Sequence, residues 1–154
     1  MLKIISGIAE GQVLQRGKDG FALAELDGVC DSVGEVAIWI ETQQGQPISG
    51  RLVVPVEQGK KFRAVLKGIP VGGPYEVCLA AGSENLRLKA VYVGDVWLLG
   101  GQSNMEGCGR MDVPDPADLR VRAFSMDREW RVAQEPLHVL ASSPDPVHYC
   151  CAAE

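Results

Sequence analysis

The stretch Glu35–Glu41 reads EVAIWIE, in which every second residue from Val36 onward is a branched aliphatic side chain. Successive side chains of a β-strand point to opposite faces, so Val36, Ile38 and Ile40 are predicted to share one buried face. No helical spacing of apolar residues competes with this alternation, and the stretch therefore predicts a half-buried strand. The opposite face of that strand carries Ala37, Trp39 and Glu41.

Similar short stretches recur through the first 92 residues, with turn-forming residues between them. Lys61–Leu66 (KFRAVL) alternates in the same way, and Gly17–Gly20 and Gly82-Ser83 are typical turn sequences. Because short strands at regular spacing are typical of sandwiches, we predict an antiparallel β-sandwich over residues 1–92. Its other strands are expected at Phe21–Leu26, Leu52–Val56, Tyr75–Leu79 and Leu86–Val93, and its other turns at Asp27-Gly28, Gln44-Gly45, Gln58-Gly59 and Val71–Pro74.

The pattern changes after Gly94-Asp95, where Val96–Leu99 (VWLL) is apolar at every position. Continuous burial is typical of strands in parallel sheets, which are covered on both faces. We therefore expect a buried strand here, with Trp97 in the core, and the beginning of a three-layer α/β domain over residues 93–154. Within that domain, a proline-rich loop is expected at Val113–Asp118, a second strand at Arg120–Met126 and a core position at Trp130.

Ser103, in the sequence GGQSNMEG, is the candidate catalytic residue. Gly100 and Gly101 allow a sharp turn after the strand, which would expose the serine hydroxyl close to backbone N–H groups that stabilise an oxyanion. The alternative is structural, because Ser103–Glu106 spells the S-x-x-E capping box of a helix, and the spacing alone favours this role. The two roles are compatible, since a capping serine can still be reactive.

Four motifs, in order along the chain, resemble those of one enzyme family: Val13–Arg16 (VLQR), Gly72–Glu76 (GGPYE), Val91–Gly107 (VYVGDVWLLGGQSNMEG) and Trp130–His138 (W…AQEPLH). Together they resemble the sialate O-acetylesterase-like carbohydrate esterases, which are SGNH-type serine hydrolases. The resemblance implies that the α/β domain is of the SGNH-hydrolase type and that the chain corresponds to the N-terminal portion of such an enzyme. It also implies hydrolysis of acetyl esters on sugar hydroxyls through an acyl-enzyme on Ser103.

A serine nucleophile needs a base that a carboxylate orients. In the resembled family these two residues lie in an Asp-x-x-His motif near the C-terminal end of the catalytic domain. Asp145 and His148 have this spacing, but they follow Ser103 closely and no family motif was identified around them. We therefore expect the catalytic Asp-His pair to lie outside these 154 residues, either on a second polypeptide or on a part of a longer esterase that is not included here. The chain alone is expected to be inactive. His138 is expected to be structural.

For several polar and aromatic residues the sequence is compatible with two different roles. Gln102 and Asn104 flank the serine and are suited equally to positioning the substrate or oxyanion and to forming a plain turn. Trp39 could stack on a sugar ring, although packing against the catalytic domain is the favoured role. Arg16 is expected to form a structural ion pair. The alternative function is a non-catalytic carbohydrate-binding or assembly module, in which Ser103 is only a helix cap.

The composition excludes several other classes of protein. The net charge is −5 and no basic run is present, which argues against nucleic-acid or anionic-membrane partners, and no apolar stretch approaches a membrane span. The five cysteines form no CxxC pair, so no zinc site or disulfide framework is indicated. No metal or organic cofactor is expected, and the family resemblance implies that the partner is an acetylated carbohydrate. Because no signal peptide is recognisable, we expect the chain as written to be cytoplasmic, or secreted or periplasmic if a leader was removed.

Overall fold

The computed structural model describes residues 1–101, 113, 115–137 and 144. The chain divides into two units, Met1–Val96 and Trp97–Glu154. Among the described residues all regular structure is β-strand, and no helix with the length and apolarity of a membrane span is present.

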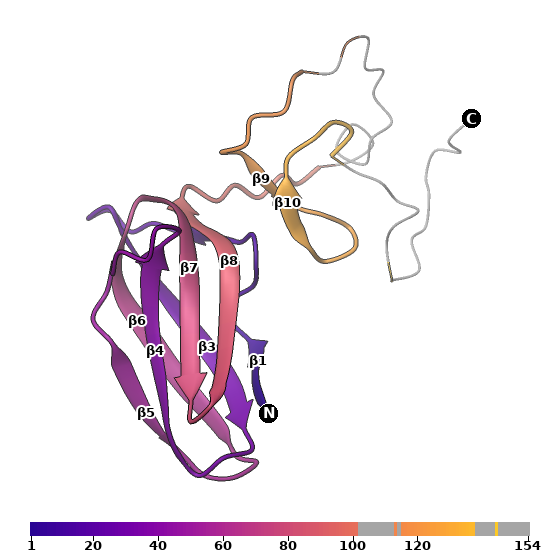
Figure 1. The fold of residues 1–154 in the computed structure, drawn as a ribbon. Helices are drawn as coiled ribbons and strands as arrows, with labels where there is room; N and C mark the ends of the chain where they lie inside the picture. Colours follow the sequence, from indigo (N-terminus) through magenta and orange to yellow (C-terminus); the bar gives the residue numbers. More distant parts are fainter. Residues whose placement is uncertain (102–112, 114, 138–143, 145–154) are drawn as a thin grey trace. The chain divides into compact units, whose positions relative to one another are not determined.

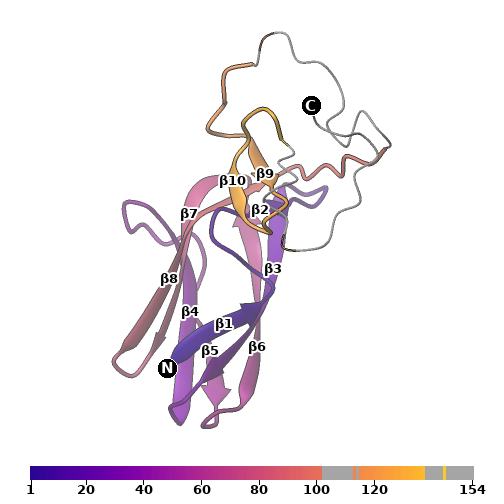
Figure 2. The ribbon, with the colours of Figure 1, turned by 90° about the vertical axis from the view of Figure 1, so that its right-hand side faces the viewer.

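Two β-sheets form the first unit (Figures 1 and 2). The smaller sheet has the order β1-β3-β6 and the larger has the order β2-β8-β7-β4-β5. Every pairing is antiparallel except that of β2 with β8, which is parallel. The strands are β1 (Leu2–Ser6), β2 (Val13–Gln15), β3 (Phe21–Cys30), β4 (Gly34–Thr42), β5 (Leu52–Val56), β6 (Lys61–Pro70), β7 (Gly72–Ala81) and β8 (Glu84–Gly94).

The hydrophobic core lies between the two sheets, which face each other in Figures 1 and 2. From the larger sheet, β4 directs Val36, Ile38 and Ile40 into this core. From the smaller sheet, β6 does the same with Phe62, Ala64 and Leu66, after which the alternation shifts and Ile69 is the buried residue. The predicted alternation at both stretches is therefore confirmed, and with it the β-rich character of the N-terminal part.

Some details of the first unit differ from the prediction. Strands β1 and β2 were not predicted, and the parallel β2–β8 pair means that the fold is not wholly antiparallel. Asp27-Gly28 lies inside β3 and is not a turn. The reason is packing: a Cβ at Gly28 would lie 2.3 Å from Cζ of Phe62, so this glycine makes room for a core ring of the neighbouring strand.

The described part of the second unit contains one short hairpin. Strand β9 (Arg122–Phe124) pairs with β10 (Trp130–Val132) in an antiparallel two-stranded sheet. The strand predicted at Arg120–Met126 is therefore present in shorter form, whereas its partner β10 was not predicted. Trp130 is half-buried and not a core residue, and its ring packs against that of Phe124 with 5.5 Å between the ring centroids.

The expectation of a buried strand at Val96–Leu99 is wrong for the structure described. These residues belong to no strand, and Trp97 and Leu98 are 82% and 97% exposed. An apolar strand is buried on both faces only where other elements cover it and neighbouring strands take its backbone hydrogen bonds. No such partner for Val96–Leu99 is present among the described residues, and the α/β continuation stays a prediction.

Candidate functional site

The predicted catalytic residues lie outside the part of the chain that the structure describes. This applies to Ser103, to its neighbours Gln102 and Asn104, and to the pair Asp145 and His148. The same is true of His138. Their roles therefore stay predictions, and the described part of the site is the sheet end from which the chain proceeds toward Ser103.

Three motifs that are far apart in the sequence meet at this sheet end. Val93, near the end of β8, is paired with Leu14 of β2 on one side and with Gly72 of β7 on the other. The VLQR, GGPYE and VYVGDVW stretches are therefore neighbours in one sheet. Their spacing along the chain gave no sign of this, because only the strand register brings them together.

The VLQR motif holds the chain where β8 ends. The Arg16 guanidinium donates from Nε and Nη2 to the two carboxylate oxygens of Asp95, at 3.0 and 3.1 Å. The backbone N–H of Val96 donates to Oε1 of Gln15 at 2.7 Å, and the N–H of Arg16 donates to the Gly94 carbonyl oxygen at 2.9 Å. The predicted ion pair of Arg16 is thus confirmed, with Asp95 as its partner.

The GGPYE motif fits tightly against the same strand. Gly73 has φ of 117°, and a Cβ there would lie 2.7 Å from the carbonyl oxygen of Val91 and 3.1 Å from Cα of Tyr92. A side chain at this position would therefore clash with backbone as well as adopt an unfavourable φ. Tyr75 is buried and its hydroxyl donates to the Pro70 carbonyl oxygen at 3.2 Å. Burial raises the pKa of this tyrosine.

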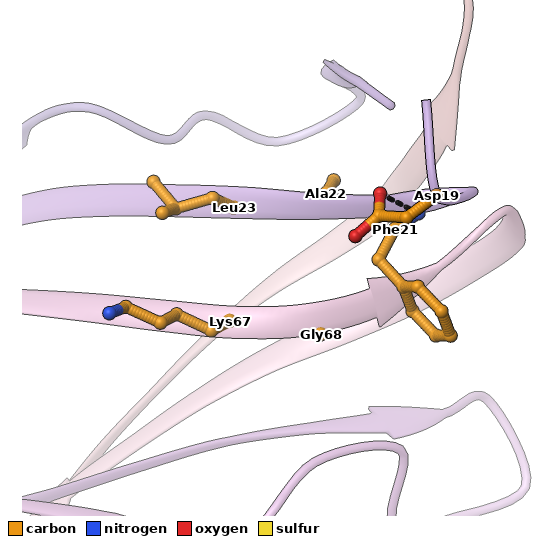
Figure 3. A pocket seen from close by; sticks show the side chains of 6 residues that line it. All are labelled: Asp19, Phe21, Ala22, Leu23, Lys67 and Gly68. Atoms are coloured by element: carbon orange, nitrogen blue, oxygen red, sulfur yellow. Dashed lines mark hydrogen bonds between the residues drawn. The ribbon is translucent and has the colours of Figure 1, made fainter. Parts of the chain in front are cut away.

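A depression of about 320 Å³ lies on the first unit beside β3 and β6 (Figure 3). Phe21 and Leu23 supply exposed apolar surface, and Lys67 supplies one charge. The carboxylate of Asp19 accepts a hydrogen bond from the backbone N–H of Phe21. The lining contains no serine, cysteine or histidine, so it does not offer the hydroxyl or thiol nucleophile and histidine base of a serine-type hydrolase.

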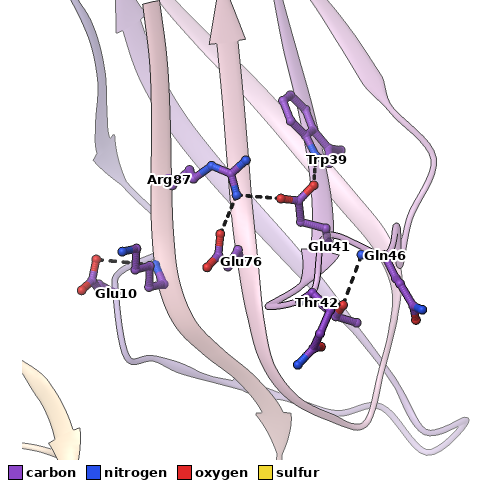
Figure 4. Close-up of polar contacts among 9 residues, drawn as sticks. Glu10, Trp39, Glu41, Thr42, Gln46, Glu76 and Arg87 are labelled. Carbon is purple, nitrogen blue, oxygen red and sulfur yellow. Dashed lines mark hydrogen bonds and ion pairs between the residues drawn. The ribbon is translucent and has the colours of Figure 1, made fainter.

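A polar cluster lies on the larger sheet, across β4, β7 and β8 (Figure 4). Nη1 of Arg87 donates to Glu41 at 2.7 Å and to Glu76 at 2.6 Å. The indole N–H of Trp39 donates to the other oxygen of Glu41 at 2.7 Å. The hydrogen bond from Trp39, and then that from Arg87, lower the pKa of Glu41. Sequence reasoning singled out Trp39 alone, because only the register places Glu41 opposite Glu76.

The donor set of this cluster suits an ion-pair network and not a metal centre. Ligand atoms of Glu41, Glu76 and Cys78 lie within 4.8 Å of one another. However, the Arg87 guanidinium already bridges the two carboxylates, so a cation would have to compete with it. Burial, followed by the charge of Glu41, raises the pKa of Cys78 to about 11, which keeps the thiol protonated at neutral pH.

Trp39 also borders a second depression, of about 380 Å³, together with Asn85, Leu86 and Arg87. The guanidinium carbon of Arg51 lies 4.7 Å from the centroid of the indole ring. This is the geometry of a cation–π contact, and it covers one face of the ring. A sugar could stack on that face only by displacing Arg51.

Comparison with known proteins relates the chain to one group of enzymes. A family model for carbohydrate esterase, sialic acid-specific acetylesterase, matches residues 93–151, a range that includes Ser103 as well as Asp145 and His148. The crystal structure of a carbohydrate acetylesterase from Xanthomonas citri is similar, with 27% sequence identity and a TM-score of 0.52. The match covers 70% of this chain and 22% of that one. No curated protein matches significantly. Over this range the chain is thus similar to the carbohydrate esterases of the sialic acid-specific acetylesterase family.

Proposed function

We propose that this chain belongs to a carbohydrate O-acetylesterase and supplies its nucleophile, Ser103. The observation that carries the proposal is the family match over residues 93–151, because it spans the GQSNM motif. The similarity to a solved carbohydrate acetylesterase supports the same activity class. The three motifs meet at the end of β8, where they build the sheet end that precedes the serine in the chain.

In the proposed reaction, the Ser103 hydroxyl attacks the carbonyl carbon of an acetyl ester on a sugar. A histidine base takes the hydroxyl proton and passes it to the departing sugar oxygen. Water then attacks the acetyl-enzyme and releases acetate and free serine. Backbone N–H groups and a side-chain amide, for which Gln102 and Asn104 are candidates, stabilise the oxyanion in both steps. These donors require no cofactor.

The test uses the assembled enzyme, in which the chain is combined with any polypeptide that supplies the Asp-His pair. A fluorophosphonate probe should label Ser103, and Ser103→Ala should lose both labelling and acetate release from acetylated sugars. Ser83→Ala, in the exposed turn between β7 and β8, serves as the control and should retain both. A Ser103→Ala variant that still releases acetate at the wild-type rate would contradict the proposal.

A further variant identifies the base. If Asp145 and His148 are not the catalytic pair, His148→Ala should leave labelling of Ser103 unchanged. Loss of labelling in His148→Ala, with an unchanged melting temperature, would assign the pair to Asp145 and His148.

The alternative function, a non-catalytic carbohydrate-binding or assembly module, finds less support. A carbohydrate-binding module would stack a sugar on the ring of Trp39. However, Arg51 covers one face of that ring, and the indole N–H already donates a hydrogen bond to Glu41. In this alternative Ser103 is a helix cap, and Ser103→Ala would cost only about 1 kcal/mol of stability.

A further inference from the structure

The contacts at the end of β8 are concentrated on the segment that leads toward Ser103. The last residue that β7 pairs with in this direction is Val93. Beyond it, Gln15 of β2 pairs with Gly94, and the N–H of Arg16, the residue after β2, donates to the Gly94 carbonyl oxygen. Asp95 and Val96 are then held by the side chains of Arg16 and Gln15 respectively.

We propose that Gln15 and Arg16 are positioning residues for catalysis, which hold the chain at Asp95-Val96 and so fix the direction in which it leaves the sheet toward Ser103. This inference rests on the proposed function. We refer to the Gln15–Val96 and Arg16–Asp95 contacts together as the exit clamp.

The exit clamp is more directional than an ion pair held by a single hydrogen bond. The two parallel N–H···O bonds from Arg16 orient the Asp95 carboxylate as well as attract it. The amide of Gln15 is itself oriented, because its Nε2 donates to the Arg16 carbonyl oxygen at 2.9 Å while its Oε1 accepts from Val96. Gln15, the last residue of β2, and Arg16, which follows it, therefore fix two adjacent residues that follow β8.

The Arg16–Asp95 pair is expected to contribute little to the stability of the fold. The side chains of Arg16 and Asp95 are 41% and 48% exposed, and ion pairs this exposed contribute little to folding. Placement of a nucleophile is far more sensitive, since a misplacement of about 1 Å can reduce catalysis by about 100-fold. Loss of the exit clamp is therefore expected to affect catalysis, through the position of the serine, more than it affects the free energy of unfolding.

The first unit contains a matched control for the Arg16–Asp95 pair. Arg63 of β6 donates from Nε and Nη2 to the two carboxylate oxygens of Asp27, at 2.8 and 3.1 Å. This pair has the same bidentate geometry and is also solvent-exposed, but it joins β3 and β6 in the smaller sheet.

The experiment compares Arg16→Gln with Arg63→Gln in the assembled enzyme and measures kcat, KM and melting temperature. We expect Arg16→Gln to lower kcat about tenfold, within the range for a displaced catalytic group, with KM changed less than twofold. Arg63→Gln should leave kcat unchanged. The reversed pair Arg16→Asp/Asp95→Arg should recover part of the lost kcat. Equal kcat values for Arg16→Gln and Arg63→Gln would overturn the proposal.

A second measurement is independent of activity. In the 154-residue chain, the backbone N–H of Val96 should exchange with solvent about tenfold faster in Gln15→Ala than in wild type, because it loses its acceptor. Unchanged exchange would overturn the exit clamp even in an active enzyme. The Ser103→Ala variant separates failure of the proposed function from failure of this inference. If that variant is fully active, the nucleophile assignment is wrong, and the positioning role of Gln15 and Arg16 is wrong as well. If Ser103→Ala is inactive and Arg16→Gln is normal, only the positioning role is wrong.

Discussion

Strand β4 and the segment after β8 use the same kinds of apolar side chain in opposite environments. Ile38 of β4 has no exposed surface, whereas Leu98 is 97% exposed. β4 has β5 on one side and β7 on the other, and the smaller sheet covers its apolar face. Val96–Leu99 pairs with no strand among the described residues. The comparison shows that the burial of an apolar residue depends on its neighbours more than on its own hydrophobicity.

The first prediction tests this contrast directly and has the largest expected effect. Ile38→Ala should lower the free energy of unfolding by about 3 kcal/mol, because it leaves a cavity in the core. Leu98→Ala should change it by less than about 0.5 kcal/mol, as for other exposed positions. Urea unfolding of the chain measures both. A cost of about 2 kcal/mol or more for Leu98→Ala would mean that this side chain is covered in solution, and the contrast would then disappear.

The second prediction concerns how tightly the sheet end before Ser103 is built. Gly73→Ala should cost about 2 kcal/mol or more, because it combines an unfavourable φ with a close approach to the backbone of Val91 and Tyr92. Gly45→Ala is the matched control, since Gly45 also has a positive φ, of 77°, but has open space around it. It should cost about 1 kcal/mol. Equal costs by thermal or urea unfolding would show that the close approach at Gly73 relaxes freely.

The third and smallest prediction compares an ion pair between strands with a local one. Arg87 joins Glu41 to Glu76 across three strands of the first unit, whereas Arg120 pairs with Asp118 only two residues away. Arg87→Gln should therefore lower the melting temperature, and Arg120→Gln should leave it nearly unchanged. Differential scanning calorimetry at neutral pH measures both. A larger effect for Arg120→Gln would reverse the comparison.

The pH dependence of the same variants gives an additional check. The pKa of Glu41 is lowered in the folded state from its ordinary value of 4.5. Its contribution to stability is therefore present above pH 4.5 and is lost as the pH falls through the lowered pKa. The difference in melting temperature between wild type and Arg87→Gln should shrink in that window. A difference that stays constant between pH 6 and about pH 3 would show that Glu41 does not carry it.

The two regions also differ in how well they could be predicted. The alternation at Glu35–Glu41 predicted β4 to within a residue at each end, because one buried face leaves a period of two in the sequence. The apolar run at Val96–Leu99 predicted a buried strand that the structure does not show. A run without alternation carries no information about which elements cover it. Short edge strands such as β2 were missed because three residues contain too little pattern.

The candidate site also has features that could be predicted from the sequence and features that could not. The identity of the motifs and the choice of Ser103 came from residues that are adjacent in the chain, where spacing is visible. The partner of Arg16, the convergence of β2, β7 and β8, and the Arg87 cluster all depend on contacts between residues far apart in the sequence.

The amino-acid sequence by itself determined the alternating strands of the first unit, most of its turns and the order of the family motifs. These features follow from local geometry, since a period of two and a glycine at a turn act within a few residues. Only the tertiary structure decided the parallel pairing of β2 with β8, the place of Gly28 beneath Phe62 and the exit clamp at Asp95-Val96. Each depends on strand register, which places residues about 30 to 80 positions apart against one another and leaves no local pattern in the sequence.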